Sequence, residues 1–286
     1  MIGRIVIPIS LCFVAVLAPT QAWADEQNSA TGTVEQIAIP VKIEPGELRV
    51  YDVAVKMTGR MPGGDKQQPA DFDATYAIQV QHQYGRREAD GLLPLEISAR
   101  KAEATVGGQK LTLLGASFPK LTLLLDKSHR IDSAFGLPDP RSGNQMLGLN
   151  YVNLIVLFFV PDGDQPHPVG DSSAGSGWAS KVKMPGAKDK IDVVTNIVST
   201  GQEKGVKTVR VHQVWGWYVQ KMADGSPAYT RFTVDSTFEL DTGKLLRSHA
   251  ETLVYAKNPE VYTQEQQPYK VNTKIDISLV TGRADG

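Results

Sequence analysis

The run Leu154-Ile155-Val156-Leu157-Phe158-Phe159-Val160 is the longest apolar run after residue 24, and it separates two long segments with the pattern of β-strands. A Pro/Gly/Asp loop and a Ser/Gly linker follow it and end near Trp178. Between 144 and 160 apolar side chains recur at helical spacing, which favours a helix, whereas the β-branched and aromatic residues favour a buried strand. The length of the segment favours a central helix.

The clearest strand precedes this segment and covers 72–84. Its apolar side chains fall on alternate positions, namely Phe72, Ala74, Tyr76, Ile78, Val80 and Tyr84, and mostly polar side chains stand between them. A period of two over this length predicts a strand with one buried and one solvated face. Similar segments follow at short intervals, separated by turn signals such as Asp90-Gly91, Gly107-Gly108 and Asp241-Thr242-Gly243.

About eleven strands joined by short turns predict an antiparallel, meandering sheet. A helix is about 10 Å wide, whereas ten strands at about 4.8 Å spacing are nearly five times wider. The sheet must therefore curl around the helix, close into a barrel or split into two layers. The predicted fold class is mainly β: a strongly curved antiparallel meander sheet or half-barrel with one central helix. Asp126 and Asp241, and likewise Glu88 and Glu203, recur at one common spacing, which is compatible with two related halves.

Residues 1–24 are predicted to be a cleaved secretory signal. Arg4 precedes an apolar run, and Ala22-Trp23-Ala24 has the small-x-small pattern of a cleavage site. The run is shorter than the roughly 20 residues of a membrane anchor, so the protein is expected in the periplasm or outside the cell and does not span a membrane after cleavage. The further boundaries are an extension with an edge strand weakened by proline at 25–44, a meander half at 45–136, the central helix and linker at 137–177, and a second half at 178–286.

Composition excludes several classes of function. The one cysteine, Cys12, lies in the predicted signal, so the mature chain has neither a disulfide nor a thiol nucleophile. The formal net charge is −1, which provides no basic field for nucleic acid. Phosphate-binding glycine loops and dinucleotide fingerprints are missing from the sequence. No cofactor is therefore predicted.

Two motifs could carry chemistry, and each has a simpler interpretation. Gly170-Asp171-Ser172-Ser173-Ala174 is similar to a nucleophile elbow, but alanine replaces the second glycine and a linker follows. Asp162-Gly163-Asp164 with His167 offers too few ligands for calcium or zinc, and turn chemistry explains these residues. The protein is therefore expected not to be an enzyme, with a hydrolase as the least favoured class and no metal site.

The candidate ligand-contacting residues are Tyr151, Leu154, Phe158, Trp178, Trp215, Trp217 and His82. His82 lies on the apolar face of its strand, where a hydrogen-bonded core histidine is the alternative. Trp215 and Trp217 share one face by alternation and form a stacking platform if exposed, or core if buried. Tyr218 and Arg210 fall on the opposite face, which predicts that both are exposed to solvent.

An exported all-β chain with a curved meander and a helix in its concavity resembles the periplasmic lipoprotein carriers and related lipid-binding half-barrels. Pro168-Val169-Gly170-Asp171 before a Trp-led strand is similar to uncharacterised exported bacterial proteins, although 172–177 departs from their pattern. The resemblance implies a sheltered apolar groove for a lipid or a lipid-linked partner. The alternative is a structural or protein-interaction module of the cell envelope whose own side chains fill its core.

Overall fold

The structure is a computed structural model that describes residues 35–61, 70–113, 118–137, 151–170, 177–184, 189–221 and 226–280. All of them belong to the compact unit Val34–Gly286. The predicted signal at 1–24 and the linker residues 171–176 lie outside the described residues. The described residues therefore do not test the prediction of export.

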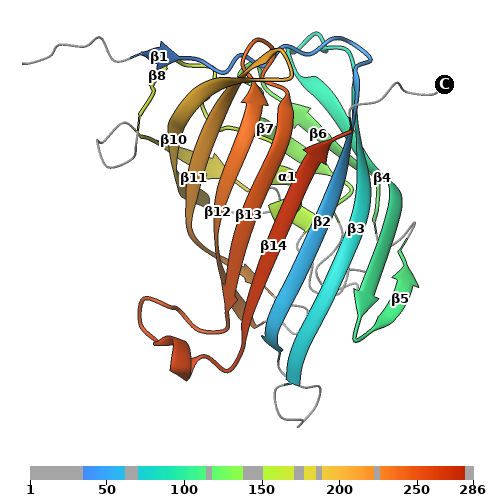
Figure 1. The fold of residues 1–286 in the computed structure, drawn as a ribbon, viewed down its shortest axis with the longest axis vertical. Helices are drawn as coiled ribbons and strands as arrows, with labels where there is room; N and C mark the ends of the chain where they lie inside the picture. The colour runs from blue at the N-terminus through green and yellow to red at the C-terminus, as the bar shows by residue number, and fades with distance from the viewer. Residues whose placement is uncertain are drawn as a thin grey trace, which may run out of the picture. The chain divides into compact units, whose positions relative to one another are not determined.

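One large antiparallel sheet dominates the described residues (Figure 1). Its first half contains β2 Leu48–Met61, β3 Ala70–Tyr84, β4 Leu93–Val106, β5 Gln109–Thr112, β6 Leu121–Leu125 and β7 Ile131–Phe135. Its second half contains β9 Trp178–Lys183, β10 Lys190–Glu203, β11 Val206–Lys221, β12 Pro227–Glu239, β13 Leu245–Tyr255 and β14 Lys270–Leu279. Eleven of these strands form one continuous path, and β5 pairs with β4 beside it.

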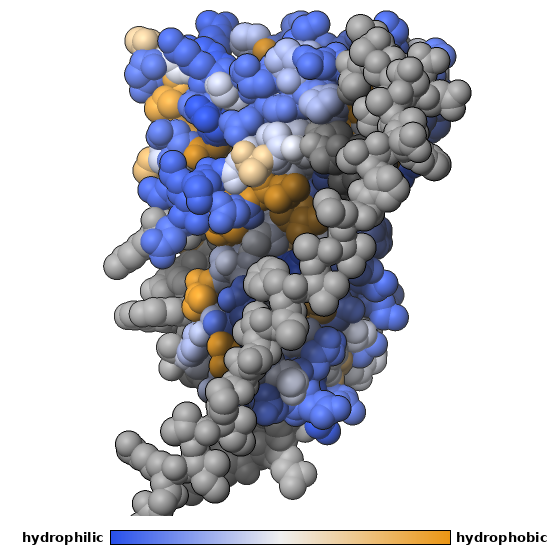
Figure 2. Space-filling view, turned by 90° about the vertical axis from the view of Figure 1, so that its left-hand side faces the viewer, coloured by the Kyte–Doolittle hydropathy of each residue, from blue (hydrophilic) through white to orange (hydrophobic). Residues whose placement is uncertain are grey.

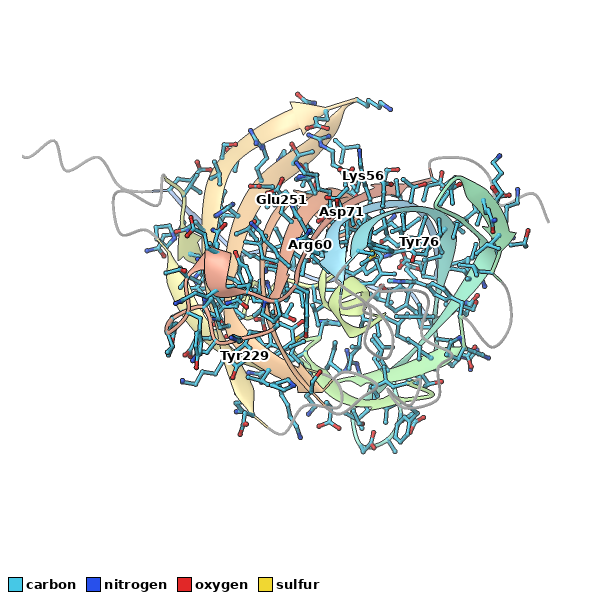
Figure 3. The ribbon with its side chains drawn as sticks, turned by 90° about the horizontal axis from the view of Figure 1, so that it is seen from below. Lys56, Arg60, Asp71, Tyr76, Tyr229 and Glu251 are labelled. Atoms are coloured by element: carbon cyan, nitrogen blue, oxygen red, sulfur yellow. The ribbon has the colours of Figure 1, made fainter. Side chains whose placement is uncertain are left out.

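The two halves join through β2 and β14, which pair along ten residues each from Lys270↔Arg60 to Leu279↔Tyr51. Across the sheet, from the β9 edge to the β7 edge, the strands of the second half therefore come first, from β9 to β14. The strands of the first half follow, from β2 to β7. Seen from below, the strands curve around α1, Tyr151–Val156 (Figure 3). The prediction of a mainly β, strongly curved meander is confirmed, with eleven strands on the main path.

The central helix is shorter than predicted, because α1 ends at Val156 rather than at residue 160. Phe158 N–H bonds to Ile155 O at 3.4 Å and Phe159 N–H to Val156 O at 3.3 Å, so the last turn tightens. Pro161 has no N–H and disfavours helical geometry in the residue before it, so a helix cannot continue beyond this point, but α1 has already ended at Val156. The predicted start at 144 lies outside the described residues.

The edge strand expected before residue 44 is reduced to β1, Gln36–Ile37, and it does not join the main sheet. It pairs instead with β8, His167–Pro168, in a separate two-stranded sheet. Ile39 donates its N–H to Gly163 O at 2.6 Å, and its side chain is buried. Because Pro40 donates no hydrogen bond, the segment packs as an irregular strap rather than as a strand.

Alternation predicted the buried face correctly for most of β11, but not for its end. The register shifts between Trp215 and Tyr218, so a β-bulge changes which residues face the core. Tyr218 is buried, with only 8% of its surface exposed, which contradicts the prediction that it faces solvent. Val219 is 58% exposed, although strict alternation places it on the buried face. Arg210, before the bulge, is exposed as predicted.

Candidate functional site

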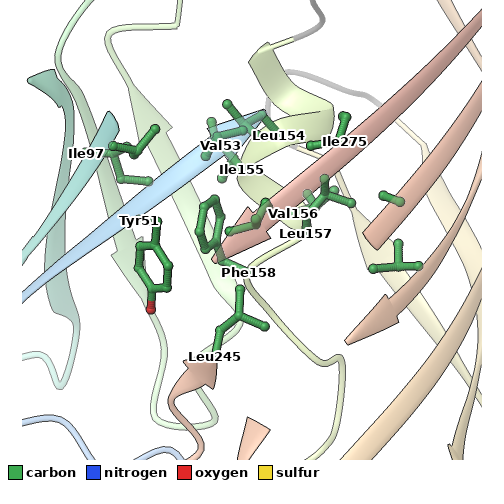
Figure 4. Close-up of a cluster of buried hydrophobic side chains, with 14 of the residues drawn as sticks. Tyr51, Val53, Ile97, Leu154, Ile155, Val156, Leu157, Phe158, Leu245 and Ile275 are labelled. Carbon is green, nitrogen blue, oxygen red and sulfur yellow. The ribbon is translucent and has the colours of Figure 1, made fainter. Parts of the chain in front are cut away.

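The end of α1 and the residues after it fill one part of the concave face. Leu154 is 3% exposed and Phe158 is 9% exposed. The Phe158 ring lies 4.9 Å from Tyr51 and 4.4 Å from His82, measured between ring centroids. Figure 4 shows Tyr51 and Phe158 in one cluster with Leu245 and Ile275 of the second half, so side chains from both halves enclose the segment. We call 154–160 the plug.

His82 lies inside this packing and carries no charge. It is 1% exposed, and neither ring nitrogen has a hydrogen-bond partner among the described residues. Burial, reinforced by the nearby Arg49 guanidinium, lowers the pKa of His82 to about 3. The core position was predicted correctly, but the expected hydrogen bond is missing.

Arg49 brings a buried charge to the same region. It is 5% exposed, and its Nε donates to Glu47 Oε1 at 2.9 Å. Its guanidinium lies 4.9 Å from the centre of the Tyr84 ring. Burial raises the pKa of Tyr51 well above its usual value because the phenolate would be poorly solvated there, and it raises the pKa of Tyr84 for the same reason, so both tyrosines stay neutral.

Little free space remains beside the plug. A cavity of about 30 Å³ lies against Phe158 and is lined also by Arg49, Tyr84, His129 and Asp164. That volume holds one or two water molecules, not an acyl chain. A second hollow of about 270 Å³ lies over β3, β4 and β5 and is lined mostly by exposed residues, including the charged Glu103 and Lys110. An apolar ligand therefore has no room between Phe158 and His82.

Trp178 lies outside this packed region. Its ring stacks on His167 with 3.6 Å between centroids and 5° between planes. Its Nε1–H donates to Pro161 O at 3.0 Å. The contacts fix β9 to the segment that follows the plug, which is a structural role.

Asp162 connects the two ends of the sheet. Its Oδ1 accepts a hydrogen bond from Nη1 of Arg130, a residue next to β7, at 3.4 Å. Its Oδ2 accepts a hydrogen bond from Oγ of Ser180, a residue of β9, at 2.5 Å. Asp162 has φ of 53°, a left-handed conformation that aspartate tolerates better than most residues. We call the contacts of Asp162 with Arg130 and Ser180 the clasp, because β7 and β9 are the two end strands of the sheet path.

The bulge separates the two tryptophans of β11. Trp215 is 1% exposed and stacks on Phe232 with 4.6 Å between centroids. Trp217 is partly exposed and contacts Tyr255 at 5.5 Å, with the Arg231 guanidinium 6.0 Å from its ring. The two rings have different neighbours, so they form no common stacking platform.

Three buried polar atoms near Trp215 have no hydrogen-bond partner among the described residues: Thr195 Oγ1, Trp215 Nε1 and Thr230 Oγ1. The sequence reading overlooked both threonines, because threonine is common in strands and alternation marks it as neither core nor site. The strand pairing places the two threonines on opposite sides of Trp215, because Thr195 pairs with Gln213 and Thr230 pairs with Tyr218.

The structure thus groups some of the predicted site residues and separates others. Leu154, Phe158 and His82 meet in the plug region, whereas Trp178 and Trp217 lie elsewhere. The side chain of Tyr151 lies outside the described part of the structure. Among these residues, His82 and Trp215 are buried and carry polar atoms without a hydrogen-bond partner in the described part of the structure.

Further kinds of site were sought in the described residues. They contain no group of three or more His, Cys, Asp or Glu side chains arranged to hold a metal ion. Within the same ranges, none of the helices has the length and apolarity needed to cross a membrane. Figure 2, which faces the side where β10 lies, shows apolar residues on a mainly hydrophilic surface, and Val194 and Val198 of β10 are 45% and 41% exposed.

Comparison with known proteins shows no family. No protein-family model and no curated protein sequence matches the chain. Among solved structures, lipovitellin, from a study of its lipid–protein interactions, is similar at a TM-score of 0.46 and 8% identity over 84% of this chain. The chain spans only 25% of the lipovitellin chain.

Two further structures are more distant. DynF from the dynemicin biosynthesis pathway of Micromonospora chersina has a TM-score of 0.21 at 9% identity, over 92% of this chain and 91% of its own. Salmonella typhi OmpF in complex with daunomycin also has a TM-score of 0.21 at 9% identity, and the match covers 84% of this chain and 100% of the OmpF chain. With every TM-score below 0.5, these likenesses carry no argument about function.

Proposed function

We propose that this protein is an exported, non-enzymatic binder that shelters a lipid-like ligand against the concave face of its sheet. The observation that carries the proposal is the mismatch between the sheet and its cover. Eleven strands form the curved path, whereas α1 has six residues. A six-residue helix is about 9 Å long, and eleven strands measure about 50 Å across.

The side chains on the concave face suit an apolar ligand. In the second half this face presents Val193, Trp215, Phe232 and Val234, all 1% exposed or less. Gln213 of β11 contacts the plug, because its Nε2 donates to Phe159 O at 3.4 Å. We therefore propose that the ligand lies on the concave face away from the plug, whereas the sequence suggested a ligand sheltered against the central helix.

A second function has its own support. The plug is fully packed and the cavity beside it is about 30 Å³. That observation favours a structural or protein-interaction module of the cell envelope whose core is filled by its own side chains. The two functions differ in whether the native protein takes up an apolar molecule.

The test is native mass spectrometry of the purified protein together with titration of N-phenyl-1-naphthylamine, an apolar dye. Co-purifying lipid, or saturable dye binding that lipid displaces, is the expected result. An unliganded mass together with no dye binding would reject the ligand binder and leave the structural module.

Export is a separate part of the proposal and rests on the pattern at 1–24. Amino-terminal sequencing of the protein from its native host is expected to begin at Asp25. An intact Met1 form in the membrane fraction would contradict cleavage.

A further inference from the structure

Aromatic and cationic side chains meet on the outer face of the sheet, near the end where β13 is joined to β14. Phe232 of β12 is buried on the concave side, so its neighbour Arg231 lies on the outer face. The Arg231 guanidinium lies 6.0 Å from the centre of the Trp217 ring, and Trp217 contacts Tyr255 with 5.5 Å between ring centroids. Lys270 Nζ lies 5.8 Å from the centre of the Tyr255 ring. The four side chains therefore form one contiguous cluster at cation–π distances across β11 to β14.

Exposed apolar side chains extend this cluster. Val219, two residues after Trp217 on β11, is 58% exposed. The loop 256–269 projects beyond the ends of β13 and β14 (Figure 1), and its Val261 and Tyr262 are 70% and 41% exposed. Lys257 Nζ lies 4.9 Å from the centre of the Tyr262 ring, so this loop repeats the cation–π arrangement. We call the following residues the outer patch: Trp217, Val219, Arg231, Lys257, Val261 and Tyr262.

The loop is held in a defined shape beside the strands. Gln267 Nε2 donates to Lys257 O at 3.0 Å, and Gln267 Oε1 accepts from the Lys257 N–H at 2.8 Å. Lys270 Nζ donates to Gln264 Oε1 at 3.2 Å, which ties the loop to the cluster on the sheet. The apolar tip of the loop is therefore positioned before any partner binds, and little ordering is lost on binding.

The chemistry of the outer patch suits the interfacial layer of a lipid bilayer. Tryptophan and tyrosine collect at the level of lipid headgroups, and long cationic side chains reach the phosphates from there. Valine neither stacks on a sugar nor forms side-chain hydrogen bonds, so the exposed valines favour an apolar partner over a polysaccharide.

Charge favours an anionic bilayer over a second copy of the chain. Arg231 and Lys257 provide two exposed cations, which Glu260 and Glu265 of the loop offset in part. A two-fold interface would place the patch against itself and bring like charges together. Anionic lipid instead attracts such cations.

We propose that the outer patch docks the protein on the surface of an anionic lipid bilayer. Val219, Val261 and Tyr262 enter the interfacial layer, and Arg231 and Lys257 contact lipid phosphates. The inference goes beyond the proposed function and does not require it, because docking uses the outer face of the sheet and the ligand lies on the concave face.

The experiment is co-flotation of the full chain from residue 25 with vesicles of phosphatidylcholine alone or of equal parts phosphatidylcholine and phosphatidylglycerol. Val261→Asp is expected to weaken binding to the anionic vesicles about tenfold or more, because an apolar contact is replaced by a charge. Val280→Asp is the matched control, since Val280 is an exposed valine at the other end of β14. Arg231→Gln should weaken binding about fivefold, whereas Arg100→Gln, at an exposed arginine of β4, should leave it unchanged.

The outcomes separate this inference from the proposed function. Equal binding of wild type and Val261→Asp, or equal wild-type binding to both kinds of vesicle, would overturn the inference. A dimer in analytical ultracentrifugation that Val261→Asp dissociates, together with no vesicle binding, would assign the patch to a second copy and overturn it as well. Dye binding by the concave face is measured without vesicles, so its failure would overturn the proposed function alone.

Discussion

At the residue scale, Phe158 is the clearest test of the plug. Because it is 9% exposed and packs against Tyr51 and His82, Phe158→Ala should lower the free energy of unfolding by about 3–5 kcal/mol. Phe135, which is 57% exposed, is the matched control, and Phe135→Ala should stay within about 0.5 kcal/mol of wild type. Urea denaturation measures both. Equal, small losses would mean that the plug does not pack in the sheet.

His82 should make stability depend on pH. Its folded-state pKa of about 3 lies below the value of about 6.5 expected in the unfolded chain. Between these values the unfolded state binds a proton that the folded state does not. The stabilisation is therefore complete above about pH 6.5 and falls as the pH drops, by up to about 1.4 kcal/mol per unit.

His82→Leu should remove that part of the slope. Denaturant melts of both proteins from pH 7 to pH 4.5 give the comparison. The pKa of His129 is also lowered, by burial and by Arg87. Its effect on the pH dependence of stability is the same in both proteins, so it cancels in their difference. Parallel pH profiles would show that His82 is protonated or solvated in the fold.

At the element scale, local chemistry explains what the sequence could and could not predict. Turns were predictable where glycine is required, as at Gly107 and Gly108, whose φ values are 55° and 81°. Pro161 limits a helix to residue 160, where the prediction ended it, and does not mark the earlier end at Val156. The bulge after Trp215 left no sequence signal except Gly216, where a Cβ would lie 3.2 Å from Asp192 O. Its effect on Tyr218 was therefore missed.

The clasp belongs to this scale as well. Asp162→Ala removes a charged acceptor from buried Ser180 and an exposed ion pair with Arg130, so the free energy of unfolding should fall by about 1.5–3 kcal/mol. Asp164→Ala, two residues away, should cost no more than about 0.5 kcal/mol. Thermal or urea melts provide the values.

A double-mutant cycle separates the contact from the backbone strain of alanine at positive φ. The loss for Asp162→Ala with Ser180→Ala together should be smaller than the sum of the single losses by at least about 0.5 kcal/mol. Additive losses would show that Asp162 acts through its backbone alone.

At the scale of the whole molecule, strand character was predictable and strand order was not. Alternation depends on neighbouring residues, and the width of the predicted sheet required curvature. The pairing of β2 with β14 joins residues such as Val53 and Ile277, which no local pattern connects.

The joint between β2 and β14 predicts that the two halves unfold together. The three described tryptophans, Trp178, Trp215 and Trp217, lie in the second half, so the fluorescence of the mature protein reports that half, whereas far-ultraviolet circular dichroism reports the whole sheet. Leu95→Ala removes a 0% exposed side chain from β4 in the first half and should cost about 2–5 kcal/mol. If the sheet is one cooperative unit, both signals should shift to the same lower urea midpoint.

Val261→Ala, at a position that is 70% exposed in the second half, should shift neither signal. A fluorescence midpoint that stays at the wild-type value while the dichroism curve splits would show two independently folding halves.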